Sequence, residues 1–273
     1  MFCEKLRAAR ERNNSLLCVG LDPDPRLIPT ADATSFFRAI IEATSDLVCA
    51  YKPNLPFFEA MGRVGMELLA QVMAAIPKDL PVIGDGKRND VPHAARFYAK
   101  ALFDIHGFDA AIVNPYLGME ALGPFFEYQD RGVFLLCRTS NPGAAAIQDV
   151  RLQDGRLLYE VVAEAARDWG HGDNLGLVVG ATRPVALEKV RAICPSMTLL
   201  LPGIGAQGGD MESAVRAAID EDGGGFIVSS SREVIYASRG RDFAEQARGA
   251  ACRLRDSINL QRDMVLSSGR GDV

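Results

Sequence analysis

Short runs of apolar residues recur along the whole chain, and the stretches between them show helical periodicity. Most of these runs are almost continuously apolar, which is typical of parallel β-strands that helices cover on both faces. The expected strands are residues 15–21, 47–52, 81–87, 109–115, 132–138, 175–181, 197–203 and 224–230. Among the stretches between them, residues 57–76, 157–169 and 183–194 carry apolar side chains at helical spacing and are expected to be helices.

This alternation predicts an α/β protein. Eight strand signals with helices between them, within 273 residues, favour a single (β/α)8 barrel, or TIM barrel, with a doubly wound open sheet as the alternative. No internal repeat or linker is visible, so residues 1–273 are expected to form one domain. The small, polar residues at 266–273 are expected to form a flexible tail. Residues 141–156 form a long connection with a turn signal at Asp154-Gly155, and connections of that length are often functional.

Composition excludes several classes of protein. With 48% hydrophobic and 24% charged residues, the chain is neither disordered nor low in complexity. A formal net charge of -5 argues against a broad nucleic-acid surface. No apolar run approaches the roughly 18 residues of a membrane span, and the charged N-terminal segment predicts a cytoplasmic location without a secretory signal. Six scattered cysteines and three distant histidines predict neither disulfides nor a metal site.

Polar residues follow the expected strands, and the third strand carries the most informative of them. In a (β/α)8 barrel the active site forms at the C-terminal ends of the strands. Asp85 and Lys87 are two residues apart in DGKRND, so a regular strand would point both side chains to one face as a preformed ion pair. Asp90 lies beyond the expected strand end and cannot be placed on that face. A surface salt bridge is the alternative interpretation of the Asp85–Lys87 pair.

The loops after the seventh and eighth strands have the composition of a phosphate site. PGIGAQGGD at 202–210 offers unobstructed backbone N–H groups that lead into a helical pattern. SSSREV at 229–234 adds hydroxyl groups and Arg232, whose guanidinium can bind phosphate in a bidentate manner. These two loops are the recurrent phosphate position of the barrel fold, so we predict that they bind a phosphorylated ligand.

Several strings together resemble the orotidine 5′-phosphate decarboxylase family, in particular its longer-chain branch. GLDPDP, YKPNLPFFE, DGKRND, VNPYLG, CRTSNPG and PGIGAQGG occur in the family's order and spacing from about residue 16 to 237. DxKxxD alone is shared with other barrel enzymes that act on sugar phosphates, whereas the full ordered set is specific. The chain departs from the family at Ala94, where relatives often carry threonine, and at Gly86, which is commonly alanine.

The resemblance implies a site made of two groups of residues. The family's charged tetrad falls on Lys52, Asp85, Lys87 and Asp90, the last donated by the partner subunit of a homodimer with shared active sites. The implied substrate-binding residues are Asp22 at the ribose, Ser140 at the pyrimidine edge, Gln207 and Arg232 at the phosphate, together with Pro202, Gly205 and Ser231 in the same loops.

The activity that the resemblance implies is decarboxylation of orotidine 5′-monophosphate to uridine 5′-monophosphate in pyrimidine biosynthesis. No cofactor and no metal are expected, because Lys87 would both stabilise the C6 carbanion and protonate it. Nucleic acid and membrane are not expected partners. Two alternatives are a metal-dependent decarboxylase or synthase for a sugar phosphate, and a non-catalytic nucleotide-binding barrel.

Overall fold

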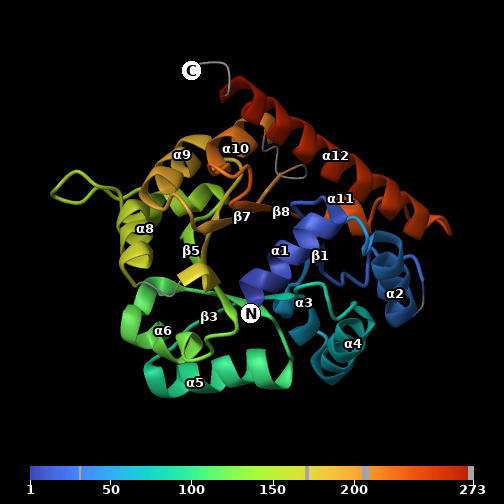
Figure 1. The fold of residues 1–273 in the computed structure, drawn as a ribbon. Helices are drawn as coiled ribbons and strands as arrows, with labels where there is room; N and C mark the ends of the chain where they lie inside the picture. Colours follow the sequence, from blue (N-terminus) through green and yellow to red (C-terminus); the bar gives the residue numbers. More distant parts are fainter. Residues whose placement is uncertain (31, 170–171, 205–209, 270–273) are drawn as a thin grey trace.

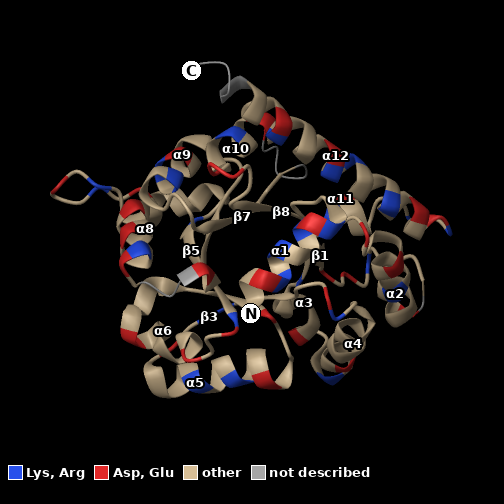
Figure 2. Ribbon diagram, in the orientation of Figure 1, with Lys and Arg blue, Asp and Glu red and all other residues tan. Residues whose placement is uncertain are grey.

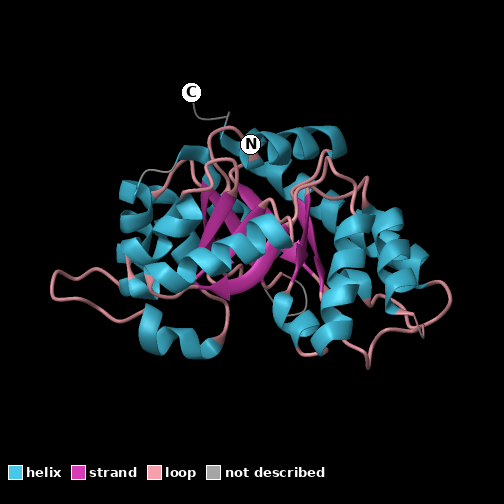
Figure 3. Cartoon of the chain, turned by 90° about the horizontal axis from the view of Figure 1, so that it is seen from below, coloured by secondary structure: helices cyan, strands magenta, loops and turns pink. Residues whose placement is uncertain are grey.

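Eight parallel strands form the centre of the molecule, and helices surround them (Figure 1 and Figure 3). The computed structural model describes the chain except for residues 31, 170–171, 205–209 and 270–273. The strands are β1 (Leu17–Leu21), β2 (Ala50–Pro53), β3 (Ile83–Arg88), β4 (Ala110–Val113), β5 (Gly132–Arg138), β6 (Leu175–Val179), β7 (Thr198–Pro202) and β8 (Phe226–Ser230). Each coincides with one of the eight apolar runs, so the predicted (β/α)8 barrel is confirmed and the open sheet is wrong.

The strands are ordered β2-β1-β8-β7-β6-β5-β4-β3. Every neighbouring pair in this order forms a parallel ladder. The two outer strands of the list, β2 and β3, meet through isolated parallel bridges, Tyr51 with Val82 and Asn54 with Asp85. These bridges close the barrel, and we call this contact between β2 and β3 the seam.

Helices cover the barrel on the outside. They are α1 (Phe2–Asn13), α2 (Ala33–Thr44), α3 (Leu55–Glu59), α4 (Gly62–Ala75), α5 (Pro92–Lys100) with the π-turn η1 (Ala101–Ile105), α6 (Met119–Phe126), α7 (Ala145–Gln148), α8 (Leu158–Trp169), α9 (Pro184–Ile193), α10 (Met211–Ala218), α11 (Arg232–Ile235) and α12 (Phe243–Gly269). Short 3-10 turns are η2 (Pro115–Leu117), η3 (Pro142–Ala144) and η4 (Gly172–Asn174). Figure 2 shows positive and negative residues interspersed over these outer helices.

The helix predictions are confirmed in two cases and wrong in one. The expected helices 157–169 and 183–194 correspond to α8 and α9. The continuous helix expected at 57–76 is wrong, because α3 ends at Glu59 and α4 begins at Gly62. Gly62 has φ 62°, a left-handed conformation that breaks an α-helix and that glycine adopts without strain.

Two other expected segments contain more regular structure than their composition indicated. The connection 141–156 includes η3 and α7 and ends in an antiparallel bridge between Arg151 and Leu157. The segment 266–273 was expected to be a tail, yet α12 continues to Gly269. The last four residues lie outside the described part of the chain.

Apolar side chains pack in two separate layers. The larger cluster fills the space between the strands and the helices. The smaller cluster fills the barrel interior, with residues such as Ile83, Ile112 and Phe134. Phe2 and Leu6 of α1 belong to this inner cluster, because α1 lies across the N-terminal end of the barrel (Figure 1). That end is therefore plugged, and the polar strand ends lie at the opposite end.

Candidate active site

Three charged side chains at the seam form a continuous chain of ion pairs. Lys52 of β2 donates from Nζ to Asp85 Oδ2 of β3 at 2.7 Å, and Lys87 Nζ donates to the other carboxylate oxygen, Oδ1. Lys52 and Asp85 are each 6% exposed, whereas the side chain of Lys87 is 47% exposed. We call these three residues the charge chain. Its buried end is fixed inside the barrel, and its other end, the Lys87 ammonium, faces solvent.

The pKa values of the buried pair follow from their mutual attraction. Burial alone would raise the pKa of Asp85, but the ammonium groups of Lys52 and Lys87 outweigh burial and hold it below its ordinary value. Burial would likewise lower the pKa of Lys52, but the carboxylates of Asp85 and Asp22 outweigh it and the pKa is raised. Both residues are therefore charged at neutral pH.

The backbone of Lys87 differs from a regular strand. The predicted contact between Asp85 and Lys87 is confirmed, but the alternation of strand side chains is not its cause. Lys87 has φ 50°, and the register of β3 against β4 shifts between Gly84 and Arg88. A left-handed conformation costs a non-glycine residue roughly 1–2 kcal/mol. The strand end is thus bent so that the ammonium returns to the carboxylate of Asp85.

Asp22, directly after β1, is the second acidic group near the charge chain. Its Oδ1 is buried without a hydrogen-bond partner in the described part of the chain. Burial raises the pKa of Asp22, although the Lys52 ammonium and a hydrogen bond from Ser231 oppose that rise. The Tyr236 hydroxyl donates to the Asp22 backbone oxygen at 2.7 Å and anchors the strand end. An unpartnered buried acceptor of this kind is ready to receive a ligand hydroxyl.

Glycines allow two of the predicted residues to approach the strand ends closely. A Cβ at Gly20 of β1 would lie 1.7 Å from Ser231 Oγ, so only glycine leaves room for that hydroxyl. A Cβ at Gly180, after β6, would lie 2.7 Å from the backbone N and Cα of Ser140. Ser140 and Ser231 are therefore held at the same end of the barrel as the charge chain.

The predicted phosphate residues are described only in part. Pro202 ends β7 and pairs with Ser229 of β8, and Arg232 begins α11 with an exposed side chain. Within the described ranges, the Arg232 guanidinium has no hydrogen bond or ion pair. Gly205 and Gln207 lie outside the described residues.

Asp90 is not brought to Lys87 within this chain. It follows β3 by two residues, and its Oδ1 accepts a hydrogen bond from the Val91 amide at 2.7 Å. Among the described residues no ion pair joins Asp90 to a lysine or arginine. This placement agrees with the expectation that Asp90 does not share the face of Asp85 and Lys87.

Sequence reasoning missed two features of the site. Asn54, the N-cap of α3, forms a backbone bridge to Asp85 across the seam, and its buried Oδ1 has no partner among the described residues. Asn54 lies two residues after Lys52 in YKPN, and this position at a strand end could have indicated it as a site residue. Arg138, the last residue of β5, is 1% exposed and pairs with Asp149, a contact that no local pattern indicates.

The charged and polar strand ends just described define a class of protein, a (β/α)8 barrel enzyme with its site at the C-terminal ends of the strands. In the part of the chain that the structure describes, no three His, Cys, Asp or Glu side chains gather in a way that could hold a metal ion. The described helices include none long and apolar enough to cross a membrane.

Comparison with known proteins identifies the family. Residues 15–247 match the model of the "Orotidine 5'-phosphate decarboxylase / HUMPS family", and the chain belongs to that family. It is 52% identical over 265 residues to the orotidine 5'-phosphate decarboxylase of Roseiflexus sp. (strain RS-1), covering 94% of this chain and 97% of the relative. It is 47% identical to that of Dehalococcoides mccartyi (strain ATCC BAA-2266 / KCTC 15142 / 195), covering 96% and 98%.

Solved structures agree with this assignment. The structure of Leishmania donovani OMP decarboxylase is 40% identical, with a TM-score of 0.86 over 96% of this chain and 99% of that one. A structure from Toxoplasma gondii described as a putative orotidine-monophosphate-decarboxylase is 35% identical, with a TM-score of 0.89 over 98% and 99%. The resemblance stated from the sequence motifs is thereby confirmed.

Proposed function

We propose that the charge chain performs the decarboxylation of orotidine 5′-monophosphate, with Lys87 as the proton donor to C6. The chain is a carboxy-lyase of pyrimidine biosynthesis, because its family and its near full-length relatives are orotidine 5'-phosphate decarboxylases. The observation that carries the proposed mechanism is the position of the Lys87 ammonium: it is exposed to a ligand while its carboxylate partner, Asp85, is buried.

The chemistry requires a concentrated positive charge. When the C6–CO2 bond breaks, its electron pair stays on C6, where the pyrimidine ring delocalises it poorly. The Lys87 ammonium stabilises this carbanion and then transfers a proton to C6, which gives uridine 5′-monophosphate and CO2. Asp85 keeps the ammonium directed, and Lys52 neutralises the second oxygen of Asp85. We propose that this step needs no cofactor.

The size of the Lys87 contribution sets a limit on what it explains. An ammonium about 3 Å from a unit negative charge contributes roughly 5 kcal/mol at an effective dielectric near 20. At about 1.4 kcal/mol per tenfold in rate, that corresponds to some four decades. The remaining acceleration must come from preorganisation of the site and from binding energy at distant parts of the substrate.

We assign the distant contacts to the other strand ends. Asp22 accepts from the ribose hydroxyls, and the unpartnered oxygen of Asn54 offers a further acceptor beside it. Ser140 reads the pyrimidine edge. Arg232 binds the phosphate together with Gln207 and the backbone N–H groups of Gly205 and Ser231, and Pro202, at the end of β7, lines the same loops. The raised pKa of Asp22 supports its role, because a ligand hydroxyl would satisfy a carboxylate that burial now disfavours.

We further propose a homodimer in which Asp90 completes the partner's site. Exposed apolar side chains occur on the elements that follow Asp90 or that its segment contacts: Val91 is 57% exposed, Phe97 of α5 is 65% exposed and Tyr116 of η2 is 82% exposed. Asn89 donates to the Asn114 backbone, which joins the Asp90 segment to η2. Apolar residues gathered around a charged side chain are typical of an interface core that carries a functional group. The predicted cytoplasmic location stays a prediction.

The activity is tested by mixing the purified protein with orotidine 5′-monophosphate and following the absorbance of the orotate band. We expect the absorbance to fall, with the same rate in the presence of a metal chelator. A rate that the chelator abolishes would favour the metal-dependent sugar-phosphate chemistry, and binding without turnover would indicate a nucleotide-binding barrel.

A further inference from the structure

The segment that follows β5 and carries Ser140, residues 139–149, has little apolar packing of its own. Between Thr139 and Asp149 it consists of small and polar residues, the turn η3 and the single helical turn α7. Ala144 is its buried apolar residue, whereas Ile147 is 60% exposed. Apolar burial therefore contributes little to the position of this segment, and its polar contacts must hold it.

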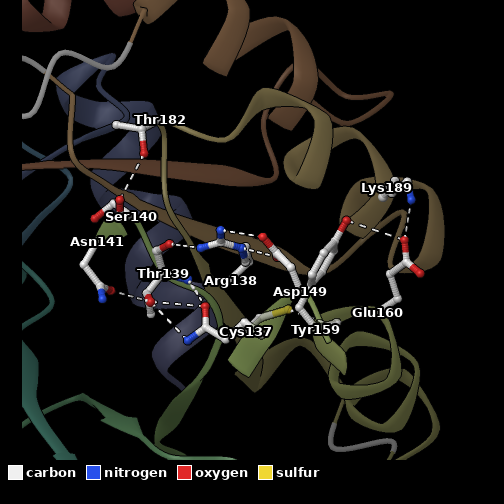
Figure 4. A network of polar contacts seen from close by, with 11 residues as sticks. Cys137, Arg138, Thr139, Ser140, Asn141, Asp149, Tyr159, Glu160, Thr182 and Lys189 are labelled. Carbon is white, nitrogen blue, oxygen red and sulfur yellow. Dashed lines mark hydrogen bonds and ion pairs between the residues drawn. The ribbon is translucent and has the colours of Figure 1, made fainter. Parts of the chain in front are cut away.

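Two sets of polar contacts join the two ends of this segment (Figure 4). The guanidinium of Arg138 donates from Nε to Asp149 Oδ1 at 2.7 Å and from Nη2 to Asp149 Oδ2 at 2.9 Å. Gln148 Oε1 accepts from the Thr139 amide at 2.8 Å. We call these contacts the clasp. The clasp joins Arg138 and Thr139, just before Ser140, to Gln148 and Asp149, at the other end of the segment. Ser140 therefore lies in a loop whose two ends are fixed to each other.

Arg138 also reaches the residue next to Ser140. Its Nη1 donates to the Thr139 backbone oxygen at 2.5 Å, and that oxygen belongs to the peptide group whose nitrogen is Ser140 N. A guanidinium presents its donors in a rigid plane, so the fork onto Asp149 also sets the direction of Nη1. Asp149 thereby determines, through Arg138, the orientation of the Thr139–Ser140 peptide.

The opposite side of Ser140 rests against β6. Gly180 N donates to the Arg138 backbone oxygen at 2.7 Å, and the missing Cβ of Gly180 leaves room for the Ser140 backbone. Figure 4 shows Thr182 directed at Ser140, and its Oγ1 lies 3.5 Å from the Ser140 oxygen. Ser140 is held between the end of β6 and the clasp. Loss of the clasp would remove the contacts on one side of Ser140 and leave those to Gly180 and Thr182.

We propose that Asp149 is a positioning residue for pyrimidine recognition, which it serves by orienting Arg138 and hence Ser140. This inference rests on the role proposed for Ser140 above. The side chain of Asp149 is 36% exposed and that of Arg138 is 2% exposed, so Asp149 lies on the outer side of Arg138 and its proposed effect on the base passes through Arg138. Its removal should weaken contacts to the base and leave contacts to the ribose and phosphate unchanged.

The test compares Asp149→Asn with Asp154→Asn as a matched control. Asp154 also pairs with an arginine, Arg156, in the same connection, but at the hairpin tip and away from the clasp. For Asp149→Asn we expect kcat/KM for orotidine 5′-monophosphate to fall about tenfold, the effect of losing one well-placed hydrogen bond. Inhibition by uridine 5′-monophosphate should weaken similarly, whereas inhibition by ribose 5-phosphate, which lacks the base, should not change. Asp154→Asn should behave as wild type.

A double-mutant cycle with Ser140→Ala separates positioning from a general loss of structure. If Asp149 acts through Ser140, adding Asp149→Asn to Ser140→Ala should cause almost no further loss of kcat/KM. Asp149→Glu, which keeps a carboxylate for Arg138, should recover much of the activity. Asp149→Asn could lower the melting temperature much more than the control does. In that case Gln148→Ala, which removes the other half of the clasp, should likewise weaken inhibition by uridine 5′-monophosphate and leave inhibition by ribose 5-phosphate unchanged.

The failures of the two proposals are distinguishable. If Ser140→Ala weakens inhibition by uridine 5′-monophosphate but Asp149→Asn does not, the positioning role is overturned and the role of Ser140 stands. Equal weakening of both inhibitors, or additive losses in the cycle, overturns the positioning role as well. If Ser140→Ala itself has no effect, the assignment of Ser140 to the pyrimidine is wrong, and the inference about Asp149 fails with it.

Discussion

The β2–β3 side and the β8 side of the site differ in how their cations are held. At the seam, Lys52 is buried and paired with Asp85, which also binds Lys87. At the start of α11, Arg232 is exposed, and the described residues provide no partner for its guanidinium. The cations of the first side are thus paired within the fold, whereas on the second side the Arg232 guanidinium has no partner among the described residues.

This difference fits two separate uses of binding energy. In the proposed mechanism the charge chain stabilises the carbanion at the moment it forms, which requires that its groups be oriented during folding and not during the reaction. The phosphate is distant from the reacting carbon. In the proposed site Arg232 binds the phosphate, so the energy released there would be available to close loops over the site and to exclude water.

The largest expected effect comes from removing the free end of the charge chain. Lys87→Ala should lower kcat by about four decades or more, because both the stabilising charge and the proton are lost. Affinity for uridine 5′-monophosphate should fall far less. Lys78→Ala, which removes an exposed lysine from the loop between α4 and β3, is the control and should keep full activity. More than a few per cent of residual activity in Lys87→Ala would contradict the assignment of the proton donor.

A mixing experiment tests whether the seam side is completed by a second subunit. Lys87→Ala and Asp90→Ala homodimers should each be nearly inactive. If the two variants are mixed, unfolded and reassociated at random, about half of the dimers contain one of each, and one of their two sites is intact. Activity should then recover to roughly a quarter of wild type.

This result depends on Asp90 serving the partner's site. If Asp90 serves the site of its own chain, every site in every dimer keeps a lesion. An unchanged low rate after mixing, with subunit exchange shown independently, would therefore rule out the shared site.

A smaller effect is expected on the phosphate side. Arg232→Ala should lower kcat/KM for orotidine 5′-monophosphate by about one to two decades, the loss of a charge-assisted contact. Added phosphite should partly restore turnover of the phosphate-free substrate in wild type and much less in the variant. Arg239→Ala removes a nearby exposed arginine and serves as the control. Unchanged kinetics in Arg232→Ala would remove this residue from the phosphate site.

The smallest expected effect is a pH-dependent change in stability at Asp22. Burial raises the pKa of Asp22 in the folded state, so the carboxylate destabilises the fold above that pKa, and this penalty vanishes below about pH 4. Asp22→Asn should therefore raise the melting temperature at pH 7, by about 2–4 °C per kcal/mol for a chain of this size. The gain should disappear on acidification.

Asp24 provides a control of opposite sign. Hydrogen bonds from Arg26 lower the pKa of Asp24 to about 2, so its stabilising effect is present at neutral pH and is lost as the pH falls towards that value. Asp24→Asn should lower the melting temperature slightly at pH 7. If both variants shift the melting temperature in the same direction, the assignment of Asp22 as a buried, disfavoured carboxylate is wrong.

The parts of the fold that were predictable from sequence depend on local patterns. Continuous apolar runs identified all eight strands, because a parallel strand buried on both faces needs apolar residues at nearly every position. The break between α3 and α4 was missed, because apolar periodicity continues through Gly62 while its backbone does not. The pattern of apolar and polar side chains indicates which positions are buried, but it does not indicate the backbone φ angle of a single residue.

The site shows the same limit. Asp85 and Lys87 were recognisable by spacing, yet the bend that joins them arises from the left-handed conformation of Lys87. Arg138 and Asp149 are eleven positions apart in the sequence, and the segment between them contains two short turns, η3 and α7, so no periodicity relates the two residues. Asn54 became a candidate only when its buried oxygen proved to have no partner.

Because the Lys52–Asp85 ion pair lies at the seam, it also affects which part of the barrel unfolds locally first. Ladders of hydrogen bonds join all the remaining neighbouring pairs of strands, whereas β2 and β3 are joined by isolated bridges and by this buried ion pair. Amide hydrogens of β2 and β3 should accordingly exchange with solvent sooner than those of β5 and β6. A change at Lys52 or Asp85 should then alter the local opening of the barrel as well as the step that we propose for the charge chain.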